Sequence, residues 1–351
     1  MHISAFDFDL PPEAIAQEPP LERDGARLLV LDRAEGTRSD RAVRDLPALL
    51  EPGDLLVLNR SRVMPARLHG RRANGQPAEV LLLQPAAAPP PSDAEQSWHA
   101  LLRPGKRLRA GDSVAVGDDL TVQVADAAPG PDGRRLVALR AARGTVEQAI
   151  ERHGHVPLPP YIRRHDTPED RRRYQTIYAR EPGSVAAPTA GLHLSERVFA
   201  GLRERGVEWT EVVLHVGPGT FQPVRAEQVE EHRLPPEPLL IPPAAQAAVA
   251  AARARGGRVV AVGTTAVRAL ESAAGADGAL HAGPGETDLV IVPGHRFRVV
   301  DALLTNFHLP RSSLLLLVSA FAGRERVLEA YAHALASGYR FYSYGDAMLV
   351  R

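Results

Sequence analysis

Residues 186–221 read AAPTAGLHLSERVFAGLRERGVEWTEVVLHVGPGTF and combine two turns of small residues with two histidines and a short helix. Small residues let the backbone come close to a ligand, because no bulky side chain stands in the way. His193 and His215 each follow a leucine at the edge of an apolar run, a setting that can hold an imidazole near its switching pH. The stretch is typical of one wall of a ligand pocket.

The same stretch opens the C-terminal half of the chain, in which helices alternate with strands. Ser195 is a good N-cap for a helix that Gly206 ends, and residues 207–216 then favour a strand. The later elements that we expect are a helix over 242–255, a strand over 259–262, a helix beginning near Ala266, strands over 289–292 and 299–304, a helix after Ser312 or Ser313, a helix over 325–337 and a final aromatic strand over 339–345. Strands alternating with helices predict an α/β layer structure.

The N-terminal part of the chain has a different pattern of apolar residues and turn signals. Apolar runs at 27–33 and 53–59 predict two buried strands, whereas residues 66–143 hold several short, alternating strands separated by Gly and Asp turn signals. Short, closely spaced strands without helices indicate a small antiparallel barrel, with residues 85–96 as a surface loop. We therefore expect a mixed-sheet α/β main domain, residues 1–62 and 148–351, with a small antiparallel β-barrel domain inserted as residues 63–147.

The composition of the chain excludes several classes of function. Its 351 residues contain 42 Lys+Arg and 42 Asp+Glu, so no global charge favours nucleic acid, although a local patch can still bind it. There is no cysteine, which excludes disulfides, thiolate catalysis and cysteine-ligated metals. The N-terminus lacks the pattern of a signal peptide, and the longest dense apolar segment, 314–322, is far shorter than a membrane span. We expect a cytoplasmic protein with no membrane partner.

Residues 259–270, VVAVGTTAVRAL, predict a strand that turns directly into a helix. Free N–H groups at the start of such a helix suit a carboxylate or a phosphate, and Thr264 and Thr265 lie beside them. The alternative is that the two threonines only cap their own helix. The segment is no dinucleotide fingerprint, because it lacks GxGxxG.

Two more turns follow predicted strands and carry histidines. His215 precedes the Gly-Pro-Gly turn that begins at Gly217, and His308 follows Asn306 at the end of the strand over 299–304. Ligands usually bind at strand ends of an open α/β sheet. A tight surface turn, or a core histidine with its hydrogen bonds satisfied, is the ordinary alternative for each site taken alone.

Two weaker patterns concern metal and RNA. His153 and His155 lack a third well-spaced ligand, so no metal is predicted. Arg163 and Arg164 lie near Tyr161 in an arginine-rich segment, and arginines with aromatics can hold phosphates and stack unpaired bases. A solvated charged face is the alternative, since acidic residues within 166–170 partly neutralise the segment.

Several long segments give the chain a family resemblance. They include FDFDLPPEAIAQ at 6–17, GSVAAPTAGLHL at 183–194, LHVGPGTFQPV at 214–224, VVAVGTTAVRALES at 259–272, VVDALLTNFHLP at 299–310 and YRFYSYGDAMLV at 339–350. The chain resembles the S-adenosylmethionine:tRNA ribosyltransferase-isomerase family of queuosine biosynthesis over nearly its whole length. Members of that family look like α/β proteins with an inserted β-barrel, in agreement with the organisation predicted above.

The resemblance implies an uncommon use of S-adenosylmethionine. The ribosyl part moves to the aminomethyl group of 7-aminomethyl-7-deazaguanine at the wobble position of a tRNA with a GUN anticodon. It isomerises there to give epoxyqueuosine, with release of adenine and methionine. The resemblance implies S-adenosylmethionine as cosubstrate, no metal or redox cofactor, and a monomer.

Set against that chemistry, the candidate residues take provisional roles. Proton transfers are assigned to three histidines, with two further residues orienting them or accepting hydrogen bonds: His193, His215, His308, Asn306 and Asp346. The candidates for holding S-adenosylmethionine are Thr189, Gly191, Gly217, Thr220, Thr264 and Thr265. The candidates for holding tRNA are Tyr161, Arg163, Arg164 and Arg340.

The chain departs from the family pattern at a few positions. Arg60 follows Asn59 where the family usually has an acidic or amide residue, and Pro235 replaces a histidine. Two other readings therefore remain open: an S-adenosylmethionine-dependent enzyme acting on a different amine, and a non-catalytic RNA-binding protein. The former predicts adenine release with a small amine, and the latter predicts tolerance of changes at His215 and His308.

Overall fold

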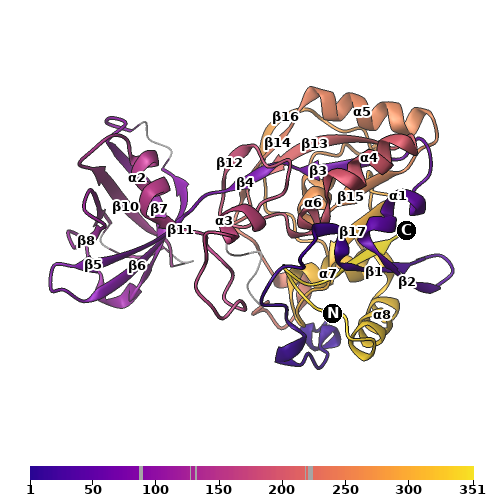
Figure 1. The fold of residues 1–351 in the computed structure, drawn as a ribbon, viewed down its shortest axis with the longest axis horizontal. Coiled ribbons are helices and arrows are strands. Elements are labelled where there is room, and N and C mark those ends of the chain that lie inside the picture. The colour runs from indigo at the N-terminus through magenta and orange to yellow at the C-terminus, as the bar shows by residue number, and fades with distance from the viewer. Residues whose placement is uncertain (87–89, 127, 131–132, 218, 220–223) are drawn as a thin grey trace.

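The computed structural model describes residues 1–351 except 87–89, 127, 131–132, 218 and 220–223. Figure 1 shows two units side by side, a barrel on the left and a larger α/β unit on the right. The chain passes from the α/β unit into the barrel through β4 (Ser61–Val63), which pairs in parallel with β12 (Glu181–Ser184). The predicted fold class, a mixed-sheet α/β domain with an inserted antiparallel barrel, is confirmed.

The α/β unit is built on one nine-stranded sheet in the order β16-β14-β13-β3-β15-β17-β18-β1-β2. Its strands are β1 (Arg27–Leu31), β2 (Arg38–Ala42), β3 (Leu55–Asn59), β13 (Glu208–Leu214), β14 (Glu237–Ile241), β15 (Val259–Val262), β16 (Gly283–Thr287), β17 (Ala302–Asn306) and β18 (Ala347–Val350). The central strands β13, β3, β15 and β17 run parallel, and β18 is antiparallel to β17. Their carboxyl ends therefore meet at one edge.

Helices cover both faces of the sheet. Successive side chains of a strand point to opposite faces, so each central strand contributes to two cores. Leu55 and Val57 of β3 join the core formed with α5 to α8, whereas Leu56 and Leu58 join the core formed with α1 and α4. The helices are α1 (Leu46–Leu49), α3 (Asp170–Arg173), α4 (Glu196–Glu204), α5 (Pro243–Ala254), α6 (Thr264–Ser272), α7 (Ser313–Ala322) and α8 (Arg324–Ala336). Short 3-10 helices occur at Ile3–Phe6, Pro12–Ala14, Arg23–Gly25, Val43–Asp45, Gly105–Arg107, Thr189–His193 and Val229–Glu231.

The barrel consists of antiparallel strands that close on themselves. Its strands are β5 (Arg67–Arg72), β6 (Pro77–Pro85), β7 (Glu95–Arg103), β10 (Arg135–Ala141), β9 (Leu120–Val124) and β8 (Ser113–Val116), with β11 (Gly154–His155) added beside β5. Closure brings β5 against β8, where a Cβ on Gly70 would lie 2.4 Å from the carbonyl oxygen of Ala115. Helix α2 (Val146–His153) packs Ala149 and Ile150 into the barrel core, so the expected boundary at 147/148 falls inside this helix.

Two predicted strands are wrong. Residues 289–292 form no strand, because side chains hold the backbone there: Arg268 Nε donates to the Leu289 carbonyl at 3.0 Å, and the Leu289 amide donates to Thr287 Oγ1 at 3.1 Å. The aromatic segment 339–345 is a buried turn, in which Tyr342 adopts φ 76°. The predicted strand at 299–304 is displaced, since it begins only at Ala302.

The charged segment 166–173, for which a solvated face was the alternative, is anchored by a buried carboxylate. Asp170 accepts hydrogen bonds from Arg164 Nη1 and Nη2 at 2.6 and 2.8 Å, from the Thr167 amide at 2.8 Å and from the Tyr344 hydroxyl at 2.7 Å. Burial alone would raise the pKa of Asp170, but the Arg164 guanidinium and the Tyr344 hydroxyl outweigh it and lower the pKa to about 2. The carboxylate thus ties the loop to the C-terminal turn.

Replacing this carboxylate should destabilise the fold. Asp170→Asn removes the buried charge that pairs with Arg164, so we expect a loss of about 3 kcal/mol in the free energy of unfolding, measured by urea titration at pH 7. Glu169→Gln, at the exposed residue directly before this short helix, is the control and should stay within about 0.5 kcal/mol of the unchanged protein.

The loss of stability in Asp170→Asn should also depend on pH, and it should become smaller as the pH falls. The folded-state pKa of about 2 lies below the unfolded value, so the stabilisation is complete above that unfolded value, about 3.9, and disappears as pH falls toward 2. The difference between Asp170→Asn and the unchanged protein should therefore shrink as the pH falls from about 3.9 toward 2. A difference that is absent at pH 7 would contradict the anchoring role.

Candidate active site at the ends of the parallel strands

Polar side chains converge where the four parallel strands end. Asn59 ends β3, His215 follows β13, Thr264 begins the helix after β15, and Asn306 ends β17. Carboxyl ends of parallel strands are the usual ligand-binding edge of an α/β sheet. The structure thus brings to one edge several residues that lie far apart in sequence.

A small cavity of about 20 Å³ opens at this edge, beside the start of α6. Gly263 makes the turn with φ 89°, and no side chain caps the helix, so the idea that the threonines cap it is wrong. Thr265 Oγ1 and Asn306 Oδ1 are buried and have no hydrogen-bond partner among the described residues. The cavity is lined by Ala187, Pro188, Thr189, Ala190, Gly263, Thr264, Thr265, Thr305, Asn306, His308 and Leu314. Buried polar atoms of this kind require a partner, which a ligand can supply.

Asn306 fixes the protonation state of His193. Its Nδ2 donates to the Tyr342 carbonyl at 3.0 Å and to His193 Nε2 at 3.0 Å. A carbonyl can only accept a hydrogen bond, so the group of Asn306 that faces Tyr342 must be its NH₂. The same NH₂ group donates to His193 Nε2, and the ring proton of His193 is therefore on Nδ1. Burial, reinforced by the charges of Arg340 and Arg23, lowers the pKa of His193 to about 4. The imidazole is neutral near pH 7.

His308 is held in a second buried position on the wall of the small cavity. Its Nε2 lies 2.8 Å from Thr305 Oγ1, and its amide donates to the Tyr331 hydroxyl at 3.0 Å. Burial lowers the pKa of His308 to about 3. A neutral imidazole of this kind can accept a proton from a ligand, and it becomes an imidazolium cation when it does.

His215 faces a different and larger cavity, of about 390 Å³, between the barrel and the α/β unit. Its Nδ1 is buried without a partner among the described residues, and burial, opposed by Glu181, lowers its pKa. Gly183 makes room for the ring: its φ is 132°, and a Cβ there would lie 3.0 Å from His215 Cε1. The structure therefore places the three histidines in three cavities: His308 lines the small cavity, His215 lines the large one, and His193 lines a separate cavity of about 10 Å³. His193 is linked to the small cavity through its hydrogen bond to Asn306.

Sequence reasoning missed two polar supports of this edge. Asn59 bridges β3 to the end of β13, with Nδ2 donating to the Leu214 carbonyl at 2.9 Å and Oδ1 accepting from the Leu214 amide at 3.1 Å. Glu237 accepts from the Gly217 amide at 2.7 Å and forms a buried ion pair with Arg268 of α6. The charged Arg268 in the apolar run Ala266–Leu270 is the signal that could have revealed this pair.

Of the other predicted site residues, two have roles in the fold and two line the cavities. Both carboxylate oxygens of Asp346 accept from backbone amides, those of Arg27 at 2.8 Å and Arg340 at 2.7 Å, so Asp346 holds the C-terminal turn. A Cβ on Gly191 would lie 2.0 Å from the Tyr178 hydroxyl, which explains that glycine by packing. Thr189 lines the small cavity, and Gly217 lines the large one. Thr220 lies outside the described residues.

The residues predicted to hold tRNA divide into two groups. Arg164 is engaged by Asp170 and by Glu18, at 2.7 Å, and these carboxylates raise its pKa. Tyr161 packs edge-on against Tyr342, with 3.7 Å between ring centroids, and bonds to Ser343. Both side chains are therefore committed to internal contacts.

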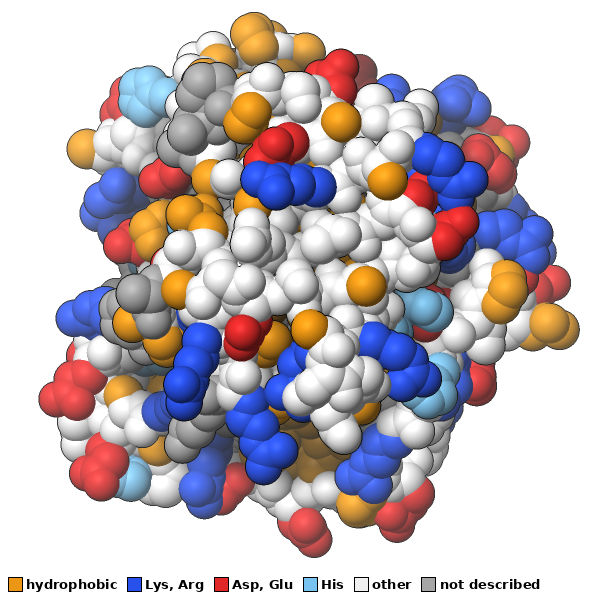
Figure 2. Space-filling view, turned by 90° about the vertical axis from the view of Figure 1, so that its left-hand side faces the viewer, with side chains coloured by type: hydrophobic (Ala, Val, Ile, Leu, Met, Phe, Trp, Pro, Cys, Tyr) orange, Lys and Arg blue, Asp and Glu red, His pale blue; other side chains and the backbone are white. Residues whose placement is uncertain are grey.

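Arg163 and Arg340 keep a more open setting. Arg163 is exposed and lines a cavity of about 300 Å³ that also contains Arg67, His69 and His165. Arg340 lies near the surface and donates to the Glu18 carbonyl at 3.4 Å. Figure 2 views the molecule from its barrel end and shows Lys and Arg side chains gathered in the lower half of that face, with acidic side chains between them.

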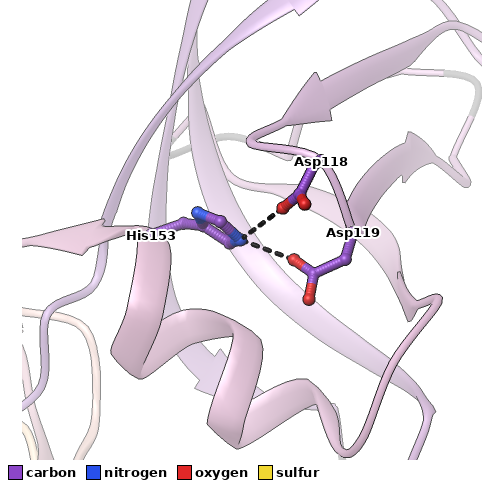
Figure 3. A group of neighbouring side chains, drawn as sticks. All are labelled: Asp118, Asp119 and His153. Carbon is purple, nitrogen blue, oxygen red and sulfur yellow. Dashed lines mark hydrogen bonds and ion pairs between the residues drawn. The ribbon is translucent and has the colours of Figure 1, made fainter.

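One cluster of potential metal ligands occurs among the described residues, and it lies in the barrel. Ligand atoms of Asp118, Asp119 and His153 lie within 4.8 Å of one another, with the ring of His153 facing both carboxylates (Figure 3). Arg143 also pairs with Asp118, and Arg152 pairs with Asp119 at 2.6 Å. Two guanidinium groups so near oppose a bound cation. The cluster instead fastens α2 to the turn between β8 and β9.

His155, the neighbour of His153 in the predicted pair, points elsewhere. Its Nδ1 lies 2.8 Å from Asp166 Oδ1, and its ring packs edge-on against His69. The two histidines therefore share no ligand-binding position. Among the helices of the described residues, none has both the length and the apolar character needed to cross a membrane.

Comparisons with known proteins agree with this architecture. Residues 3–350 match the family model described as queuosine biosynthesis protein. The chain is 51% identical over 352 residues to the S-adenosylmethionine:tRNA ribosyltransferase-isomerase of Moorella thermoacetica, covering 100% of both chains. It is 53% identical over 350 residues to the protein of that name from Anaeromyxobacter dehalogenans, covering 100% of this chain and 99% of the relative.

A solved structure matches as well. The crystal structure of the S-adenosylmethionine tRNA ribosyltransferase of Thermotoga maritima is 37% identical in sequence, with a TM-score of 0.56, and the match covers 99% of this chain and 100% of that one. The match of the family model over almost the entire chain and the high identity to relatives along their full length agree with one another. The chain belongs to the queuosine biosynthesis protein family.

Proposed function

We propose that this protein transfers the ribosyl group of S-adenosylmethionine to tRNA and isomerises it there. The observation that carries the proposal is the small cavity at the strand ends, where unpaired polar atoms lie beside the buried, neutral His308 and beside Asn306, which binds the buried, neutral His193. The full-length similarity to S-adenosylmethionine:tRNA ribosyltransferase-isomerases supports the assignment of the ligand. The acceptor is the aminomethyl group of 7-aminomethyl-7-deazaguanine at the wobble position of a tRNA with a GUN anticodon.

The small cavity suits the amino-acid end of S-adenosylmethionine. A volume of about 20 Å³ accommodates only one or two water-sized groups. The Thr265 hydroxyl and the first N–H groups of α6 can donate to a carboxylate, while Asn306 Oδ1 can accept from an ammonium. Donors and an acceptor side by side match the charge distribution of an α-amino acid.

The reaction requires proton transfers that neutral imidazoles can perform. The sulfonium acidifies the adjacent C5′–H, so a base of modest strength can remove that proton. Adenine then leaves with a proton, the tRNA amine forms the new bond, methionine is released, and the sugar becomes the epoxycyclopentanediol of epoxyqueuosine. His308 lines the small cavity, His193 is linked to it through Asn306, and His215 lies where the acceptor amine would enter.

The remaining parts of the proposal concern partners. Arg163 and Arg340 are the arginines whose setting leaves them available to RNA phosphates. The cavities are formed within one chain, so a monomer suffices, and the reaction takes place in the cytoplasm with S-adenosylmethionine as the cosubstrate. No metal takes part in the proposed steps.

One incubation tests this function. The protein is mixed with S-adenosylmethionine and tRNA carrying the aminomethyl-deazaguanine, and with guanine-bearing tRNA as control. We expect free adenine together with the mass of epoxyqueuosine in the first sample and neither in the control. A folded protein that binds S-adenosylmethionine but yields neither product would contradict the proposal.

Removing the unpaired hydroxyl of Thr265 should weaken cosubstrate binding without harming the fold. Thr265→Val loses one hydrogen bond to a charged group, so the Kd for S-adenosylmethionine, measured by calorimetry, should rise about tenfold or more. Thermal stability should not fall, because this hydroxyl has no hydrogen-bond partner among the residues that the structure describes. Thr121→Val, at an exposed barrel position, should leave the Kd unchanged.

Replacing the histidines should separate binding from chemistry. Each of His193→Gln, His215→Gln and His308→Gln removes one proton-transfer group, and a general acid or base contributes about 10²- to 10⁴-fold to the rate. We expect adenine release to fall by at least 10²-fold in one or more of them, while His333→Gln on the outside of α8 stays near full rate. Full activity in all three variants would exclude histidine catalysis.

A further inference from the structure

The largest of the cavities described above lies between the barrel and the α/β unit. Its volume of about 390 Å³ falls in the range of small-molecule sites, about 300–1,000 Å³. The barrel contributes Met64, Leu83, Gln84, Pro85, Gln96, Trp98, Arg134 and Glu147. The α/β unit contributes Pro182, Gly183, His215, Val216, Gly217, Pro236, Glu237 and Pro238. Neither unit forms this cavity by itself.

The barrel wall combines an apolar surface with a polar relay. Trp98 is buried, and its Nε1 donates to Gln96 Oε1 at 3.0 Å. Gln96 Nε2 in turn donates to the carboxylate of Glu147, which is exposed near the start of α2. The relay therefore ends in a carboxylate that can only accept hydrogen bonds. A ligand that meets this wall should be flat, largely apolar and edged with N–H donors.

A guanine-like base has that form. Its ring is flat, and its pairing edge carries an N–H and an exocyclic NH₂ side by side, which a carboxylate can accept together. Enzymes that modify a base take it out of the stack and hold it in a pocket between apolar side chains. The anticodon loop is single-stranded, so its bases can be splayed out at low cost.

The cavity is also close to the proposed cosubstrate site. Pro182 and Gly183 line the large cavity, and Ala187 begins the lining of the small one, so Gly183 and Ala187 lie four positions apart along one segment. Four positions of chain span at most about 13 Å. His215, on the wall of the large cavity, lies at the same strand edge as the small one.

We propose, on the basis of the function proposed above, that this interdomain cavity receives the acceptor nucleobase extruded from the anticodon loop. Glu147 holds the N–H edge of the base, and the barrel and the α/β unit close on its two faces. The aminomethyl group then points toward the strand ends, near His215. The inserted barrel is thereby a substrate-recognition domain, since one half of the pocket comes from it.

Glu147→Gln tests the recognition of the base edge. The amide presents N–H donors against the donors of the base, so the KM for acceptor tRNA should rise about tenfold or more, with kcat within about twofold and the Kd for S-adenosylmethionine unchanged. Glu151→Gln is the matched control, because Glu151 is exposed on the same helix and pairs with Arg171. A KM for Glu147→Gln equal to that of the control would overturn the role of Glu147.

Met64→Trp tests the occupant, because the larger side chain fills the cavity from its half-buried position. We expect turnover to be lost while urea unfolding and the Kd for S-adenosylmethionine stay unchanged. Full turnover would overturn the proposal, and loss of S-adenosylmethionine binding would show that the cavity holds the cosubstrate instead. If the unchanged protein itself releases no adenine with acceptor tRNA, the failure belongs to the proposed function and not to this cavity.

Discussion

The structure depends on one constraint: the polar groups that are buried at the ends of the parallel strands need hydrogen-bond partners. Asn59 satisfies the rule internally, because it bridges β3 to β13 through the backbone of Leu214. Thr265 Oγ1, Asn306 Oδ1 and His215 Nδ1 find no partner among the described residues. At this edge, polar groups with hydrogen-bond partners inside the protein belong to the scaffold, and those without such partners mark the ligand site.

Much of the fold follows from local patterns in the sequence. The alternation of apolar residues predicts the barrel strands, and Ser195 and Gly206 mark the limits of α4 correctly. The segment 259–270 predicts a strand that turns directly into a helix, and the structure places that turn beside the small cavity. These features depend on residues close together in the chain, which is why they can be predicted from it.

The failures concern long-range pairing. The aromatic segment 339–345 has the composition of a strand, but its backbone turns at Tyr342 to meet Asn306. Arg164 was predicted to contact RNA, but its guanidinium forms ion pairs with Asp170 and Glu18. The histidines were expected in one pocket and divide among three cavities. No local pattern reveals which distant residue will supply a partner.

The central claim is that S-adenosylmethionine supplies the missing partners at the strand ends. A crystal structure of the complex with S-adenosylmethionine tests it most directly. The claim predicts that the amino-acid end of the ligand bonds to Thr265 Oγ1 and Asn306 Oδ1 at the start of α6. A ligand bound elsewhere, with both atoms still unpaired, would contradict it.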